Sequence, residues 1–232
     1  MQGCGPCGAG SIPAGRPLKH SWRKKCRKLS RVKHQKVLIV FIVAPKNKRL
    51  AAYTAIALKD ISRPYKLIEV RGEDVPFWLE STISANPDAL GMTGEDLFKE
   101  YLLEKLNDTQ LKILRRITWD DEKALFKKPT LCLLGPKDFD VLEKKKELKV
   151  CINVKYKMLA KRYLNSLEPK GYIFQKTYVS GTTENAISLG IADLVIEIVY
   201  SGSTVKEYNL KIYDKIFASD FVVIGGKNDP AK

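Results

Sequence analysis

The chain has 232 residues, of which 44% are hydrophobic, so it is long and apolar enough to bury a core in one large domain or two small ones. Its longest uninterrupted apolar run, residues 37–44, is too short to span a bilayer, and the PKNKR that follows is not a secretory cleavage site, so a cytoplasmic protein is expected. The formal net charge is +15, but residues 1–36 hold ten of the Lys and Arg residues and no acid, so they carry two thirds of the excess.

Residues 1–36 are rich in Gly and then in Lys and Arg, which predicts a disordered basic tail. Specific nucleic-acid binding by a folded face needs basic side chains interleaved with stacking aromatics. The tail has Trp22 as its only aromatic residue. Specific nucleic-acid binding is therefore not expected, although such a tail contacts polyanions in a salt-sensitive way.

The five cysteines are an odd number, which argues against a disulfide framework. Cys132 and Cys151 lie in apolar runs and are expected to be buried small hydrophobes. Cys4 and Cys7 form CGPC, which resembles the thioredoxin redox motif. That chemistry needs a strand before the motif and a helix after it, and a Gly-rich stretch follows here instead. The alternative is a redox protein that works through CGPC, and residues 1–36 would then be essential for its function.

From residue 36 onwards, continuous apolar runs alternate with amphipathic segments. The first run leads through PKN into a helix whose N-cap is expected to be Asn47. Strands are expected at 36–44, 66–71, 88–94, 111–119, 129–136, 148–154, 171–180, 193–199 and 215–226. Helices are expected at 47–61, 72–83, 97–102, 157–167, 182–190 and 204–210. This alternation indicates an α/β fold with largely parallel sheets.

Three strand-to-helix junctions have the composition of an anion site. In α/β sheets, ligands bind beyond the carboxyl ends of strands, where helix N-termini offer free amides. In APKNKRL, Lys46, Lys48 and Arg49 crowd a helix start, where the macrodipole disfavours cations. An anionic partner explains them, and a solvated basic turn is the alternative. In SGTTEN, helix capping by Thr182 or Thr183 explains the pattern by itself.

The third junction, EIVYSGSTV, places Glu197 in an apolar strand just before a turn of small hydroxyl residues. Gly202 permits a turn whose amides point inward as an anion nest, and Ser201, Ser203 and Thr204 add hydroxyl donors. No lysine follows the glycine, so this is not a nucleotide P-loop. A phosphate held by amides and hydroxyls beside a carboxylate indicates a sugar phosphate, while an acid facing solvent is the structural alternative.

The stretch SGTTENAISLGIADLVIEIVYSGSTVKEYNL, residues 180–210, resembles the signature region of the ATP phosphoribosyltransferase family of histidine biosynthesis. The family pattern there is a Ser-Gly-x-x-Glu loop, Gly-x-Ala-Asp, three apolar residues, an acid and a Thr-Gly-x-Thr-Leu loop. Four earlier segments are similar, in order, to other family motifs: APKNKRL, VRGEDVPFWLE, LGMTGEDL and INVKYKMLAKRYL. The resemblance covers about residues 37–226.

The resemblance implies an α/β, two-lobed, periplasmic-binding-protein-like (type II) fold with the active site in a cleft between the lobes. Residues 37–116 plus 212–228 are expected to form lobe I, and residues 117–211 are expected to form lobe II with the phosphoribosyl-phosphate loop. The implied reaction is Mg²⁺-dependent transfer of phosphoribose from phosphoribosyl pyrophosphate to N1 of ATP, with release of pyrophosphate. Such an enzyme is a pentosyltransferase.

Matching motif positions imply the roles of individual residues. Asp193, Glu197 and Arg49 are expected to be catalytic, with both acids near the ribose hydroxyls. The expected phosphoribosyl pyrophosphate site contains Glu184, Ser201, Gly202, Ser203 and Thr204. The expected ATP or pyrophosphate site contains Lys46, Arg71, Thr93, Gly94 and Tyr156. No metal ligands are expected in the protein, since Mg²⁺ would be carried mainly by substrate phosphates.

The implied chemistry agrees with the composition. Adenine N1 has a free lone pair, so no strong general base is needed, and the only histidines, His20 and His34, lie in the tail. Arg and Mg²⁺ would neutralise the leaving pyrophosphate, and carboxylates would stabilise oxocarbenium character at the sugar. The chain resembles the short form of the family, which implies a homo-oligomer and a separate regulatory subunit similar to histidyl-tRNA synthetase. The rival is a non-catalytic anion- or nucleotide-binding or regulatory module on the same scaffold.

Overall fold

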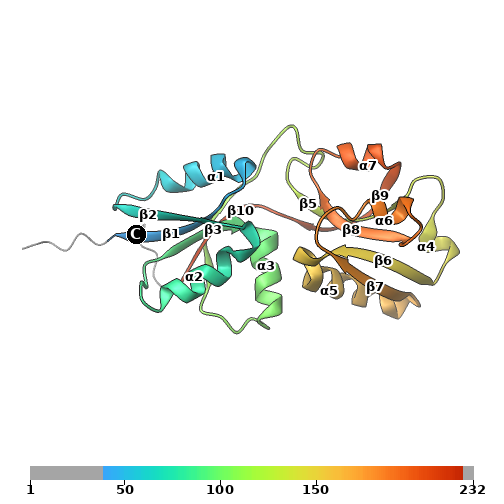
Figure 1. Cartoon of the computed structure of the whole chain (residues 1–232), viewed down its shortest axis with the longest axis horizontal. Helices are drawn as coiled ribbons and strands as arrows, with labels where there is room; N and C mark the ends of the chain where they lie inside the picture. The colour runs from blue at the N-terminus through green and yellow to red at the C-terminus, as the bar shows by residue number, and fades with distance from the viewer. Residues whose placement is uncertain (1–38, 227–232) are drawn as a thin grey trace, which may run out of the picture. The chain divides into compact units, whose positions relative to one another are not determined.

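The computed structural model describes residues 39–226, which form two five-stranded sheets (Figure 1). The first sheet, in the order β2-β1-β3-β10-β4, contains β1 (Val40–Pro45), β2 (Tyr65–Val70), β3 (Leu90–Gly94), β4 (Lys112–Ile117) and β10 (Phe221–Gly225). The second, in the order β7-β6-β8-β5-β9, contains β5 (Thr130–Pro136), β6 (Glu147–Asn153), β7 (Ile173–Val179), β8 (Leu194–Val199) and β9 (Leu210–Ala218). The two-lobed α/β architecture is therefore confirmed. The predicted tail, with its cysteines and histidines, lies outside the described residues.

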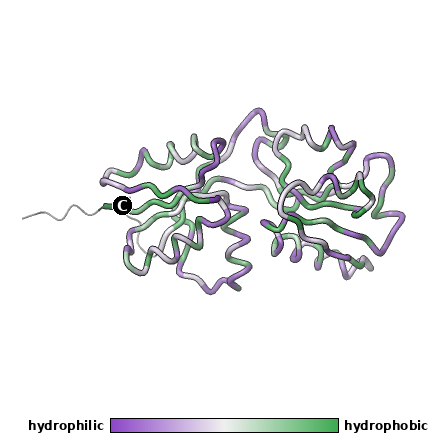
Figure 2. Tube along the Cα trace, in the orientation of Figure 1, coloured by the Kyte–Doolittle hydropathy of each residue, from purple (hydrophilic) through white to green (hydrophobic). Residues whose placement is uncertain are grey.

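Helices cover both faces of the first sheet (Figure 1). The helix α1 (Lys48–Leu58) packs on one face, where its Leu50 meets the core around Phe221. The helices α2 (Val75–Ile83) and α3 (Glu95–Glu104) pack on the other face, where Phe98 is fully buried. Burial on both faces explains why β1 is apolar along its whole length, as Figure 2 shows, and β3 is buried at every position.

Helices cover the second sheet in the same way. One face packs against α4 (Val141–Lys144) and α5 (Lys157–Leu167) around Leu133 and Leu164. The other face packs against α6 (Asn185–Ser188) and α7 (Ser203–Glu207) around Cys132 and Cys151, which are buried as predicted. Short 3₁₀ turns form η1 (Gly72–Asp74), η2 (Val154–Tyr156) and η3 (Glu168–Lys170). Within residues 39–226, no helix has the length and apolar character needed to cross a membrane.

Both sheets are mixed rather than largely parallel, because of where the chain crosses between them. Three neighbouring strands are parallel in each sheet, β2-β1-β3 and β7-β6-β8. Then β10 enters the first sheet with Phe221 opposite Gly94, the carboxyl end of β3, and therefore runs antiparallel. Likewise, β5 enters the second sheet with Thr130 opposite Val199, the carboxyl end of β8. The two chain segments that cross between the sheets, from β4 to β5 and from β9 to β10, therefore both lie at the carboxyl edges of the parallel strands.

The apolar stretch 215–226, predicted as one strand, is divided between the two sheets. Residues up to Ala218 belong to β9 and pair with β5, whereas Phe221 begins β10 in the first sheet. The predicted start of the second lobe I segment at residue 212 is therefore wrong, and the boundary lies at Ser219 and Asp220. These two polar residues hydrogen-bond at the crossing instead of extending the ladder. The helices predicted over 182–190 and 204–210 are single turns, α6 and α7.

Asp220 ties the two crossing segments together. Its carboxylate accepts hydrogen bonds from the backbone N of Trp119, at 2.9 Å, and from Lys128 Nζ, at 2.6 Å. Both donors lie in the first crossing, between β4 and β5, while Asp220 lies in the second. A carboxylate that accepts a backbone amide and an ammonium group holds both chain segments in one arrangement.

We expect Leu133→Ala to lower the free energy of unfolding by about 2–5 kcal/mol, because Leu133 is fully buried in the core of the second sheet and the change leaves a cavity. Leu189→Ala is the matched control, since Leu189 is 71% exposed. Urea denaturation followed by circular dichroism measures both. Equal losses in the two variants would contradict the core that we describe.

Candidate functional site

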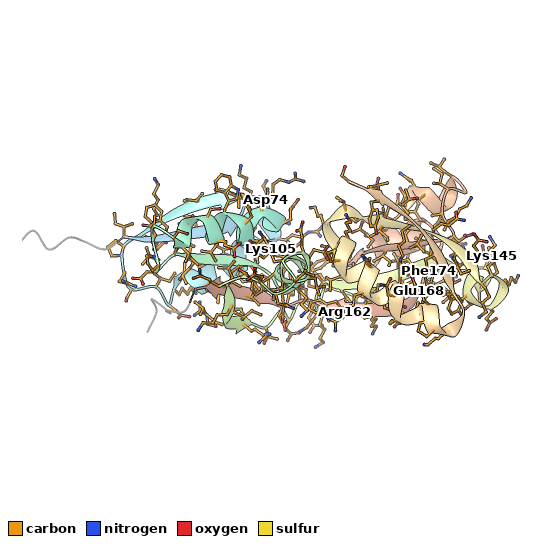
Figure 3. All side chains as sticks on the ribbon, turned by 90° about the horizontal axis from the view of Figure 1, so that it is seen from below. Asp74, Lys105, Lys145, Arg162, Glu168 and Phe174 are labelled. Carbon is orange, nitrogen blue, oxygen red and sulfur yellow. The ribbon has the colours of Figure 1, made fainter. Side chains whose placement is uncertain are left out.

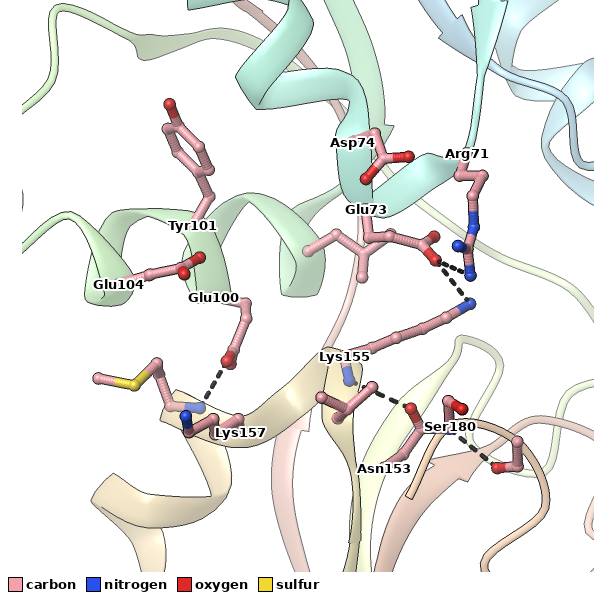
Figure 4. A pocket seen from close by; sticks show the side chains of 14 residues that line it. Arg71, Glu73, Asp74, Glu100, Tyr101, Glu104, Asn153, Lys155, Lys157 and Ser180 are labelled. Carbon is pink, nitrogen blue, oxygen red and sulfur yellow. Dashed lines mark hydrogen bonds and ion pairs between the residues drawn. The ribbon is translucent and has the colours of Figure 1, made fainter. Parts of the chain in front are cut away.

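Two neighbouring pockets lie at the carboxyl edges of the parallel strands. The larger, of about 880 Å³, is shown in Figure 4; it is lined from the first sheet by Arg71 and Glu73 and from the second by Asn153, Lys155, Ser180 and Gly181, among others. The smaller, of about 180 Å³, is lined by Asn47, Arg49, Gly94, Asp96, Tyr156 and Tyr200, among others. Parallel strands bring their carboxyl ends to one edge, which is where α/β proteins bind ligands. Residues of both lobes therefore line each pocket, as the predicted cleft requires.

Glu73 holds two cations at the boundary of the two pockets. Arg71 Nη2 lies 2.9 Å from Glu73 Oε1, and Lys155 Nζ lies 3.4 Å from the same oxygen (Figure 4). Arg71 follows β2 in the first sheet and Lys155 follows β6 in the second. A guanidinium and an ammonium on one carboxylate oxygen are already placed to bind an anionic ligand that approaches the pocket.

Arg49, which lines the small pocket, lies next to a cluster of aromatic rings. The guanidinium of Arg49 lies over the ring of Tyr200, 5.0 Å from its centroid, and Trp119 packs edge-on against Tyr200. Trp119 also stacks on Tyr53 at 4.3 Å between ring centroids. Arg49 lies in the first turn of α1, where Asn47 is the N-cap as predicted and accepts the Arg49 amide at 2.9 Å. The face of the Tyr200 ring stabilises the Arg49 cation, which the dipole at the N-terminus of α1 disfavours.

A buried carboxylate, Asp96, lines the small pocket. It accepts hydrogen bonds from the Ser219 hydroxyl, at 2.6 Å, and from the Tyr156 hydroxyl. Burial raises the pKa of Asp96, and these hydrogen bonds oppose the rise. Gly94 has to be glycine here, because a Cβ atom on it would lie 2.3 Å from Asp96 Oδ1.

Glu197 and Glu184 come together at the carboxyl edge of the second sheet, as predicted. Glu197 Oε2 accepts the side-chain amide of Asn153 at 2.9 Å and the hydroxyl of Thr183 at 3.2 Å. Burial raises the pKa of Glu197, the Glu184 charge adds to the rise, and the hydrogen bonds from Asn153 and Thr183 oppose it. Glu197 therefore faces the interior next to the larger pocket rather than open solvent, which contradicts the solvent-facing alternative.

The hydroxyl loop, Ser201–Thr204, follows β8 at the same edge. Gly202 has φ +73°, the left-handed conformation that the predicted turn needs. The hydroxyls of Ser201 and Ser203 lie 2.9 Å apart, and both residues are exposed. The loop starts immediately after Tyr200, which lines the small pocket, but the loop residues themselves line neither pocket.

Asp193 lies away from both pockets, so the structure does not bring it together with the other predicted residues. It precedes β8, at the end of the strand opposite the hydroxyl loop. Its carboxylate accepts Lys145 Nζ at 2.7 Å and the backbone N of Lys149 at 2.8 Å. Burial acts against ionisation, but these hydrogen bonds outweigh it and lower the pKa of Asp193. Figure 3 shows Lys145 far from Asp74, which lines the larger pocket.

Glu184 and Glu197 are not among the residues that line either pocket, and two further predicted residues, Thr93 and Lys46, also lie outside them. Thr93 is fully buried, and its hydroxyl donates to the Gly72 carbonyl at 2.9 Å, so it stabilises the turn after β2. Lys46 is exposed next to β1 and lines neither pocket. Of the predicted ATP-side residues, Arg71, Gly94 and Tyr156 do line the pockets.

Comparisons with known proteins identify the family of this chain. The family model described as ATP phosphoribosyltransferase matches residues 71–232. The chain belongs to this family. It is 32% identical over 165 residues to the ATP phosphoribosyltransferase of Sulfurisphaera tokodaii, covering 70% of this chain and 50% of that protein. The chain spans about half the length of such curated relatives.

Two solved structures have a fold similar to that of this chain. It is similar to the ATP phosphoribosyl transferase (HisG:HisZ) complex from Thermotoga maritima, with a TM-score of 0.60 and 26% identity over 81% of this chain and 88% of that one. The periplasmic aliphatic sulphonate binding protein of Escherichia coli matches with a TM-score of 0.54 and 13% identity, over 82% of this chain and 65% of that one. The periplasmic-binding-protein-like fold is confirmed.

Sequence reasoning missed several residues that this family member brings to the pockets. Asn153 and Lys155 follow directly on an apolar strand, and their position at its carboxyl end is the signal that would have found them. Glu73 sits two residues after Arg71 in the same motif. Trp119 and Ser219 carried no local signal, because they belong to the crossing segments.

Among residues 39–226, no group of three or more His, Cys, Asp or Glu side chains is arranged to hold a metal ion. Of the carboxylates that line the pockets, Glu73 pairs with two cations and Asp96 accepts hydrogen bonds from two hydroxyls. This donor set does not fit a resident Mg²⁺ held by the protein alone.

We expect Asp96→Asn to flatten the pH dependence of stability. Because the pKa of Asp96 is raised by burial, the folded state keeps the proton longer than the unfolded chain, so stability falls as pH rises from about 4 through the raised pKa, by at most about 1.4 kcal/mol per pH unit. Urea midpoints between pH 4 and 7 measure this. The exposed Asp108→Asn is the control, and a slope unchanged by Asp96→Asn would contradict the assignment.

We expect the catalytic rate of the Asp193→Asn variant to be close to that of the wild-type protein, because Asp193 lies at the opposite end of β8 from the hydroxyl loop. The loss of its ion pair with Lys145 lowers the free energy of unfolding by about 1 kcal/mol or less, since Lys145 is half exposed. Steady-state rates and thermal unfolding measure the two effects separately. A large loss of turnover with an intact fold would return Asp193 to the catalytic site.

Proposed function

We propose that this chain is an ATP phosphoribosyltransferase that transfers phosphoribose from phosphoribosyl pyrophosphate to N1 of ATP, the first step of histidine biosynthesis. One observation carries the proposal. Glu197 and the hydroxyl loop lie together at the carboxyl end of β8, inside the region that the family model matches. The cations of the two pockets support it, because they lie at the same edge.

In the proposed complex, the hydroxyl loop binds the 5-phosphate. Free amides at the start of α7 and the hydroxyls of Ser201, Ser203 and Thr204 are donors to phosphate oxygens. Gly202 supplies the left-handed turn that makes the loop concave. Glu197 and Glu184, at the same edge, accept hydrogen bonds from the ribose hydroxyls.

The bond between the sugar C1 and the pyrophosphate oxygen breaks, and a bond between C1 and adenine N1 forms. Pyrophosphate leaves with the electron pair of the broken bond, so negative charge develops on it. Arg49, Arg71 and Lys155 are placed at the pockets to neutralise this charge. Mg²⁺ bound to the substrate phosphates adds to the neutralisation.

Glu197 has an electrostatic role in this scheme. Positive charge builds up on the ribose as pyrophosphate departs, and an ionised carboxylate next to the sugar stabilises it. No proton has to be removed from adenine N1, so the reaction needs no histidine.

Partners of this chain follow from the same proposal. The solved complex from Thermotoga maritima contains two different proteins, HisG and HisZ. We infer that this chain likewise works in the cytoplasm as a homo-oligomer with a separate regulatory subunit, of the kind similar to histidyl-tRNA synthetase.

The decisive assay measures pyrophosphate release by the full chain with ATP, phosphoribosyl pyrophosphate and Mg²⁺, each omitted in turn, with and without a candidate regulatory subunit. Release is expected only when both substrates are present. Glu197→Gln is expected to lower kcat by roughly 100-fold or more, because a charge aimed at the transition state is lost. Binding of phosphoribosyl pyrophosphate should persist in this variant.

Glu207→Gln is the matched control, since Glu207 is an exposed acid on α7. Binding of phosphoribosyl pyrophosphate without pyrophosphate release, under all conditions, would favour the non-catalytic binding module on the same scaffold. Full activity in Glu197→Gln would remove Glu197 from the mechanism while leaving the transferase reaction in place.

A further inference from the structure

Asn153 connects the carboxyl ends of the three parallel strands of the second sheet. It ends β6, is 7% exposed and lines the larger pocket (Figure 4). Its amide Nδ2 donates to Glu197 Oε2, on β8, at 2.9 Å and to the carbonyl of Gly181, just after β7, at 3.2 Å. Its Oδ1 accepts the backbone N of Lys155 at 3.1 Å. Both amide hydrogens and the carbonyl oxygen therefore have partners.

The oxygen and the nitrogen of the Asn153 side-chain amide have different roles. The oxygen caps the short turn η2, a structural role that any small residue with a side-chain oxygen can fill. The nitrogen is directed at Glu197, and its second hydrogen is occupied by the Gly181 carbonyl. Because both hydrogens are engaged, the amide cannot rotate away from Glu197 without losing a hydrogen bond in a buried place.

Glu197 depends on its donors to stay ionised and oriented. The groups that face Glu197 are the Asn153 amide and the Thr183 hydroxyl, which favour its ionised form, and Glu184, whose charge disfavours it. Burial raises the pKa of the nearby Tyr156 and Cys151, and the charge of Glu197 adds to the rise in each. The other oxygen of Glu197, Oε1, accepts the backbone N of Ile198 at 2.9 Å. Of the two side-chain donors, Asn153 makes the shorter hydrogen bond, and it is the one that also lines the pocket.

We propose that Asn153 is a positioning residue for the transferase reaction, whose side-chain amide holds the Glu197 carboxylate ionised and aimed at the ribose. This inference rests on the proposed function. It predicts that Asn153 acts through its donor nitrogen and not through the oxygen that caps η2, and this difference makes the proposal testable.

The experiment compares Asn153→Ser and Asn153→Ala in the full chain. Serine keeps a capping oxygen for the Lys155 amide but is too short to reach Glu197, whereas alanine loses both contacts. The control is Asn165→Ser, since Asn165 is exposed on α5 in the same lobe. Circular dichroism and thermal unfolding establish which variants keep the fold.

The first readout is the pH dependence of kcat/KM for pyrophosphate release. With its amide donor gone, Glu197 keeps its proton to higher pH, so the acidic limb is expected to move to higher pH in both variants. The value at the optimum is expected to fall roughly 10-fold or more, the range for a hydrogen bond to a charged group. If the cap alone mattered, Asn153→Ser would behave as wild type, and that result would overturn the proposal.

The second readout is a titration of Glu197 by nuclear magnetic resonance with ¹³C-labelled glutamate, assigned with Glu197→Gln, which needs no turnover. The titration midpoint is expected at higher pH in Asn153→Ser than in wild type, and an unchanged midpoint would contradict the proposal. A wild-type chain that releases no pyrophosphate overturns the proposed function and this role with it. An active wild type whose pH profile does not move in either variant overturns the Asn153 assignment alone.

Discussion

The buried carboxylate of Asp96 joins parts of the chain that are far apart in sequence. It lies in the first turn of α3, where the helix dipole favours negative charge, and it binds the Ser219 hydroxyl on the second crossing and the Tyr156 hydroxyl after β6. A carboxylate removed from water is costly unless such donors satisfy it. This requirement keeps the carboxyl edges of both sheets around the small pocket, and the other pocket residues are positioned from those edges.

Strand direction follows from the same constraint. Because the chain enters and leaves each sheet at its carboxyl edge, β5 and β10 have to run antiparallel to their neighbours. The crossing segments are therefore next to the residues that line the pockets. Trp119 and Ser219 belong to the crossings and line the small pocket, and Asp220 ties the crossings to each other. The hydrogen bonds that hold the crossing segments together therefore also position residues that line the small pocket.

Cations and carboxylates lie side by side at the larger pocket, which is lined by Arg71, Lys155 and Lys157 and by Glu73, Asp74, Glu100 and Glu104. Arg71 and Lys155 meet on Glu73, and Arg49 lies on the ring of Tyr200, so these cations are held in place without being buried. Glu197 instead accepts a hydrogen bond from the neutral amide of Asn153, and no ion pair of Glu197 is found among residues 39–226. A leaving pyrophosphate and a positively charged ribose need these two environments at the same time.

The sequence by itself predicted most of the strands and the family, because apolar runs predict strands and the 180–210 motif is local. It also predicted the turn at Gly202, since a left-handed turn before a helix needs a nearby glycine and no distant partner. Only the tertiary structure showed that Asp193 pairs with Lys145, that the apolar stretch breaks at Ser219, and that Asn153 binds Glu197. Each of these depends on partners 44 or more residues away in the chain, or on which sheet a strand joins, and local patterns carry no information about either.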